Sequence, residues 1–149
     1  MRVDPRRLAA TAAALWAGII LGVGLIAAPA AFAVLQRSVA GAVAGRMFTH
    51  EAYVGLAFSA LLLWAVRRVA RDDAAAGQGS QFSLSFVLVL IALICTVFGH
   101  FGVQPMMAAA RSGEGMLSFG ALHGISTALF GLKGLALVVL AWRLAKPAA

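Results

Sequence analysis

The sequence predicts an all-α integral membrane protein, a four-helix bundle, on two observations. Hydrophobic residues make up 62% of the 149 residues and charged residues 11%, whereas soluble domains average about 45–50% and about 25%. Four apolar runs, at 8–35, 48–66, 82–103 and 117–144, each exceed or approach the roughly 20 helical residues that cross a bilayer. Backbone polar groups in lipid must be bonded within their own segment, so these runs are helices. We expect one transmembrane domain over residues 1–149.

The first run also has features of an export signal, because Arg6 and Arg7 precede it and small residues follow near its end. Its apolar stretch exceeds the roughly 7–15 residues of a signal peptide's hydrophobic region. Three further apolar runs follow. We therefore expect the first run to remain as a transmembrane helix.

Basic residues predict the orientation. More Lys and Arg flank the runs at both termini and the second connection than at the other side, which holds only Arg37, Arg46 and Arg111. Cytoplasmic loops carry the excess of Lys and Arg, so both termini should be cytoplasmic and the protein a multi-pass protein of the cell inner membrane. The net charge of +7 is therefore typical of topology signals and lipid contacts, and we expect no nucleic-acid partner.

The connections and prolines predict where the helices are interrupted. Residues 36–47 are small and apolar, which favours a short interfacial helix. Residues 67–81 read as a flexible loop. Pro29 should kink or loosen the first helix, and Pro105 should end the third.

Glycines recur at the spacing that packs membrane helices. Three small-xxx-small pairs are present: Gly18 with Gly22, Gly41 with Gly45, and Gly120 with Gly124. Such residues let helix backbones approach closely. We expect them to pack the bundle, and a leftover glycine face leaves a homo-oligomer or another membrane-protein partner open.

The histidines and one carboxylate gather near one membrane level. Glu51 and His50 open the second run, His100 lies near the end of the third, and His123 near the start of the fourth. At about 1.5 Å per residue, each lies roughly 5–9 Å inside the outward end of its run. On helical wheels Glu51 shares a face with Gly55, His50 points another way, and His123 belongs to the small-residue face. The sequence thus predicts a polar cluster at the outward end.

This cluster has three interpretations. The histidines could hydrogen-bond helix ends together, they could form part of a proton or small-solute path, or His100 and His123 could ligate a transition metal or a haem iron. No ligand spacing such as HxxxH supports the last, so we expect no cofactor.

Lys133 is a separate problem, because it lies near the middle of the fourth run and off the small-residue face. With Glu51 placed at the outward end, the two differ by roughly 15 Å in depth and should not pair unless the helices are staggered. The alternatives are a partly snorkelled lysine, a binding group for an anionic lipid or substrate, or a contact with a partner subunit.

Several short blocks resemble the transmembrane protein 205-like family of small four-helix membrane proteins. They are APAAFAVL, AGAVAGRMF, VQPMMAAARSG and FGALHGIST. The matching positions are Pro29, Phe32, Leu35, Gly41, Gly45, Arg46, Phe48, Pro105, Met106, Phe119, His123, Gly124 and Ser126. Members usually have Pro where this chain has Thr49, so the resemblance supports His123 but neither His50 nor Glu51. It implies a fold and a membrane location, and no reaction.

The sequence therefore predicts a non-enzymatic membrane protein that binds a partner, a lipid or a small solute through the outward cluster. Two alternatives are a haem- or metal-binding redox protein and a proton-coupled small-solute transporter. The candidate site residues are Pro29, Arg46, Glu51, His100, Pro105, His123, Ser126 and Lys133.

Overall fold

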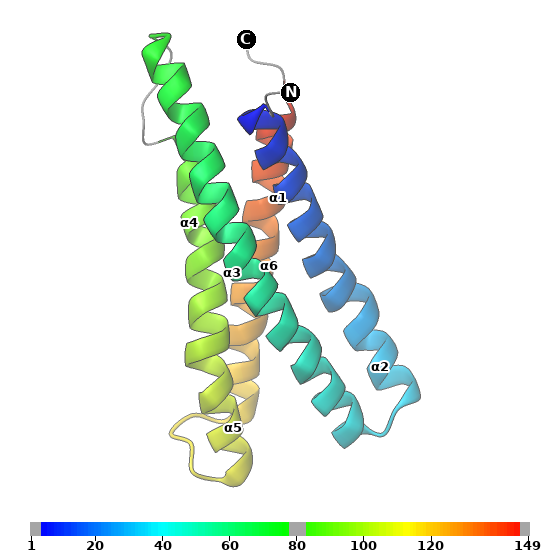
Figure 1. The fold of residues 1–149 in the computed structure, drawn as a ribbon. Helices are drawn as coiled ribbons and strands as arrows, with labels where there is room; N and C mark the ends of the chain where they lie inside the picture. The colour runs from blue at the N-terminus through cyan, green and yellow to red at the C-terminus, as the bar shows by residue number, and fades with distance from the viewer. Residues whose placement is uncertain (1–3, 78–82, 147–149) are drawn as a thin grey trace.

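The computed structural model describes residues 4–77 and 83–146, and these are almost entirely helical. Within these two ranges, four continuous helical spans are long and apolar enough to cross a membrane. They are α1 (Pro5–Leu21) with the π-helix η1 (Gly22–Ala27) and α2 (Ala28–Val34); α3 (Arg37–Ala75); α4 (Leu84–Val97) with the π-helix η2 (Phe98–Val103) and α5 (Gln104–Ser112); and α6 (Phe119–Ala145) (Figure 1). The prediction of an all-α chain with four apolar helices of membrane-spanning length is confirmed for these residues.

Local signals in the sequence set several helix ends. The side chains of Asp4, Ser83 and Ser118 each accept a hydrogen bond from a backbone N–H in the first turn of α1, α4 and α6. Such N-caps satisfy amides that have no partner within the helix. Gly113 ends α5 with a left-handed conformation, φ 81°, which glycine adopts without steric cost.

The second span is much longer than predicted. It begins at Arg37, so the expected interfacial helix is part of α3, and only Leu35 and Gln36 link it to α2. At its other end the helix continues to Ala75, through most of the expected loop. Residues 37–47 contain no proline, and α3 packs against α2, which supports helix in a stretch less apolar than the four runs. The rest of the expected loop includes residues 78–81, which lie outside the described residues.

Both intramembrane prolines follow a π-helical turn. Pro29 and Pro105 are each the second residue of the helix after η1 or η2. The amides of Ala28 and Gln104 bond five residues back, to the carbonyls of Val23 and Gly99. The wider turn accommodates the missing proline N–H and its ring. The irregularity expected at Pro29 is present, whereas the prediction that Pro105 ends its helix is wrong, because α5 continues to Ser112.

The helices form a ring in which α1 contacts α3 and α6, and α4 contacts the same two helices. The larger core cluster includes Trp16, Leu62, Val89 and Leu137. At the end that carries the α2–α3 link and residues 113–118, here called the loop end, α2 and the start of α3 diverge from α5 and the start of α6 (Figure 1). Among the described residues α2 touches only α3 and η1, in keeping with this divergence.

Reporter fusions test the predicted orientation. A cytoplasm-active reporter fused after Gly77 should be active, and one fused after Gly113 inactive, because an odd number of spans separates the two positions. An export-active phosphatase should give the opposite pattern. Equal signals from the two positions would contradict four crossings.

Candidate functional site

Three polar side chains from three helices meet inside the bundle. Lys133 Nζ of α6 lies 2.7 Å from Glu51 Oε2 of α3. Trp16 Nε1 of α1 donates a hydrogen bond to Glu51 Oε1 at 3.0 Å. Trp16 is 0% exposed, and Glu51 and Lys133 are each 4% exposed. Both carboxylate oxygens therefore have a partner, and we call these three residues the core charge cluster.

The early start of α3 explains the position of the cluster. Glu51 is 14 residues after Arg37, and Lys133 is 14 residues after Phe119. Both helices begin at the loop end (Figure 1), so each side chain lies about 21 Å along its helix. The prediction that Glu51 and Lys133 do not pair is wrong, because it placed the start of the second helix at residue 48.

Lys133 does not snorkel. Its side chain is 5% exposed, and its ammonium lies 5.0 Å from the centre of the Phe130 ring, a cation–π contact. An unpaired charge at this depth would be costly, so the carboxylate of Glu51 is what allows Lys133 to remain buried. Tertiary packing thus supplies the partner that the isolated fourth helix lacks.

A glycine makes room for the indole. A Cβ added to Gly55 would lie 2.8 Å from Trp16 Cζ2, closer than real Cβ contacts. Gly55 is one turn after Glu51 and is also buried, which confirms their predicted shared face. The Trp16 ring also stacks on Phe58, with 6.0 Å between centroids. This packing aims the indole N–H at the carboxylate.

An aromatic pair covers the cluster on the side of the loop end. Phe48 and Phe130 each precede a cluster residue by one turn, and their rings pack edge to face with 5.2 Å between centroids. A Cβ added to Gly24 of η1 would lie 2.6 Å from Phe130 Cε1. The π-helical turn therefore packs directly against the ring that covers Lys133.

Two histidines lie outside the cluster. His50 is exposed, and its Nδ1 lies 2.7 Å from the carbonyl oxygen of Arg46, whose side chain is exposed too. His100 is half-buried and packs edge-on against Tyr53, with 5.5 Å between centroids. As predicted, His50 points away from Glu51. The carboxylate itself is bonded to Trp16 and Lys133 rather than to a histidine.

His123 lies on an open face of α6. It is exposed and stacks on Phe119 with 6.0 Å between ring centroids. Ser126 is half-buried, and Gly120 and Gly124 are exposed, with nothing within 4 Å of an added Cβ. The expectation that this face packs within the bundle is wrong near the start of α6, whereas Gly134, farther along the same face, is buried. The same holds for the other glycine pairs, around which an added Cβ also meets nothing; an oligomer through these faces stays a prediction.

The histidines do not form a clustered ligand set. Within residues 4–77 and 83–146, no three His, Cys, Asp or Glu side chains are grouped to hold a metal ion. His100 and His123 each pack against different aromatic rings. Ligation of a metal or haem by these two residues stays a prediction.

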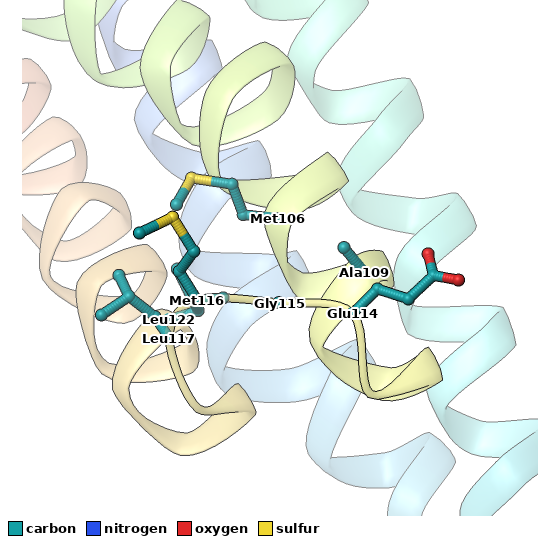
Figure 2. Close-up of a pocket in the computed structure, with 7 residues that line it drawn as sticks. All are labelled: Met106, Ala109, Glu114, Gly115, Met116, Leu117 and Leu122. Carbon is teal, nitrogen blue, oxygen red and sulfur yellow. The ribbon is translucent and has the colours of Figure 1, made fainter.

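A second feature lies at the loop end, between α5 and α6. A cavity of about 230 Å³ is lined by Met106, Ala109, Glu114, Gly115, Met116, Leu117 and Leu122. Figure 2 shows both methionine side chains beside Leu122, while the Glu114 carboxylate points away from them. Nearby, the Arg111 guanidinium lies 4.7 Å from the centre of the Phe119 ring. We call this the α5–α6 cavity.

One comparison with known proteins identifies the family. The family model described as a domain of unknown function, DUF4149, matches residues 11–115, which is well over half of the chain. The chain belongs to the DUF4149 family. Neither a search of curated proteins nor one of solved structures finds a match.

The DUF4149 match covers only part of the candidate site. It includes Trp16, Glu51 and both prolines, but it ends before α6, which carries His123 and Lys133. The description names no activity. It supports a membrane protein together with the four apolar helices, while the closer likeness to the transmembrane protein 205-like family stays a resemblance.

Trp16 is the cluster residue that sequence reasoning missed in this DUF4149 protein. A signal was present, because a tryptophan inside a membrane span has an indole N–H that needs an acceptor when buried. Within the four apolar runs of the sequence, only Glu51 offers a carboxylate. The pairing was therefore accessible in principle once both residues were placed inside the bundle.

Proposed function

We propose that this DUF4149 protein is a proton-coupled carrier of small anions, without enzymatic activity, in the inner membrane with both termini cytoplasmic. The observation that carries the proposal is the buried ion pair between Glu51 and Lys133, 2.7 Å apart. Ionisable residues inside membrane spans mark proton relays and substrate pathways by default. Replacement of a buried ion pair by apolar residues is often neutral or stabilising, so stability alone is a weak reason to keep one.

The charges suggest how a proton and an anion are coupled. When the Glu51 carboxylate takes up a proton, it becomes neutral, and the ammonium of Lys133 loses its counter-ion. A small anion can then take the place of the carboxylate beside Lys133. Release of the anion and the proton restores the pair. The core carries no net charge in either state, which avoids the cost of an isolated charge in a low-dielectric interior.

The backbone beside the cluster supports this proposal. Carriers often bind substrate near the bilayer midplane, where helices are interrupted. Here the first and third spans each contain a π-helical turn followed by a proline. Gly24 of the first such turn packs against Phe130, which covers Lys133. A small shift of η1 would therefore move the Phe130 ring, which lies between the core charge cluster and the loop end.

Tryptophan emission provides the first test. Trp64 and Trp142 are 55% and 68% exposed, so both can be replaced by Phe to leave Trp16 as the sole reporter. Protonation of Glu51 should weaken the Trp16 hydrogen bond and change its emission, while Glu51→Gln should remove that pH response. The exposed Glu114→Gln is the matched control and should leave it unchanged. Emission that does not respond to pH while the protein stays folded would contradict proton exchange at Glu51.

Transport provides the second test. Liposomes containing the protein and an internal pH dye are given chloride, nitrate, sulfate, phosphate or succinate at an acidic external pH. At least one anion should accelerate internal acidification with wild-type protein, and Glu51→Gln and Lys133→Met should each abolish the acceleration. Acceleration that persists in both variants would place the coupling elsewhere and overturn the proposal.

A further inference from the structure

The α5–α6 cavity carries an inference of its own, independent of the proposed proton coupling. Its volume of about 230 Å³ is below the roughly 300–1,000 Å³ of pockets that enclose whole small molecules. Its walls are mainly Met and Leu side chains, which adapt to flexible apolar groups. It therefore suits a segment of a hydrocarbon chain better than a complete polar solute.

The rim of the cavity is apolar on one side. Met116 is fully exposed, and Met106 and Leu117 are each 44% exposed. These residues lie at the end of two helices that are long and apolar enough to cross a membrane, and the ends of such helices meet lipid chains and headgroups. Lipid acyl chains are thus the apolar groups available to cover these exposed side chains.

Two residues of opposite charge lie at the end of α5, Arg111 in its last turn and Glu114 just after it. Arg111 and Glu114 are both exposed, and neither forms an ion pair within the described residues. Arg111 is instead held over the Phe119 ring, and the Glu114 carboxylate points away from the methionines (Figure 2). Two exposed groups of opposite charge, three residues apart in the chain, complement a headgroup that carries both signs.

We propose that the α5–α6 cavity binds phosphatidylethanolamine. Its phosphate would be bound by the Arg111 guanidinium, its ammonium would donate to the Glu114 carboxylate, and part of one acyl chain would fill the cavity beside Met106 and Met116. A phosphatidylglycerol headgroup lacks the ammonium, and that of phosphatidylcholine has no N–H to donate. The two opposite charges would therefore select among membrane lipids, which a general basic patch does not.

Native mass spectrometry from micelles containing equal amounts of the three lipids tests this site. Wild-type protein should retain phosphatidylethanolamine about three- to fivefold more than either other lipid, the effect of about one exposed charge pair. Glu114→Gln should remove that preference, and Arg111→Gln should lower retention of all three lipids. Ala109→Phe, which fills the cavity, should lower all three as well.

Arg46→Gln is the matched control, because Arg46 is also exposed but lies on α3; it should leave the preference unchanged. Thermal unfolding of each variant separates lost binding from lost folding. Equal or greater retention of phosphatidylglycerol by the wild type, or a preference that survives Glu114→Gln in folded protein, would overturn the proposal.

Discussion

Lys133→Met should lower the free energy of unfolding by about 3–5 kcal/mol, the usual cost of removing one partner from a buried ion pair. The substitution leaves the Glu51 carboxylate with only the Trp16 N–H as a partner, at 4% exposure. Glu51 must then be buried as a lone charge or become protonated. Unfolding by SDS in mixed micelles, followed by far-ultraviolet circular dichroism, measures the effect.

The double variant Glu51→Gln with Lys133→Met separates the pair from general packing. It contains no lone charge, so it should be more stable than Lys133→Met alone, and the two single effects should not add. Arg143→Met is the control on the same helix, because Arg143 is exposed in the last turn of α6; it should cost less than about 1 kcal/mol. A loss for Lys133→Met no larger than this control would mean that the ion pair contributes nothing.

Gly55→Ala should lower the free energy of unfolding by about 1–3 kcal/mol, the usual cost of overpacking a core. The added Cβ would lie 2.8 Å from Trp16 Cζ2, and the fully buried ring has little space into which to move. The substitution should also shift Trp16 emission, because the indole that bonds Glu51 is displaced. The same SDS titration and the emission of the Trp64→Phe, Trp142→Phe background measure both effects.

Gly45→Ala is the matched control on α3. A Cβ added to Gly45 meets nothing within 4 Å, and alanine is the better helix former by about 1 kcal/mol. Gly45→Ala should therefore be neutral or stabilising and leave Trp16 emission unchanged. Equal effects of the two substitutions would show that Gly55 is not needed to seat the indole.

Hydropathy was sufficient for the number and type of the spans, because an apolar run of sufficient length has few alternatives to a membrane helix. It was insufficient for their ends. Residues 37–47 are less apolar than the four runs, because they include Arg37 and Arg46, yet they extend α3, since helix formation there depends on backbone bonding and on contact between α3 and α2. Pro105 likewise reads as a helix terminator, and only the π-helical turn before it shows how the helix continues.

The predicted start of the second helix, residue 48 rather than Arg37, also led to the wrong prediction for the ion pair between Glu51 and Lys133. A helix start at residue 48 groups Glu51 with the histidines and leaves Lys133 without a partner. With α3 beginning at Arg37, the same two residues lie at equal distances along parallel helices and bond at 2.7 Å. Periodicity correctly put Glu51 and Gly55 on one face, but it contains no information about the helix that this face meets.

The sequence by itself determined that this DUF4149 chain forms four apolar helices that can cross a membrane, and that a few ionisable residues lie within them. Those features depend on composition and local spacing. Only the tertiary structure decided that Trp16, Glu51 and Lys133 form one cluster and that His123 lies on an open face. The physical reason is that a buried charge depends on its partner, and here the partners lie 35 and 82 residues apart in the chain.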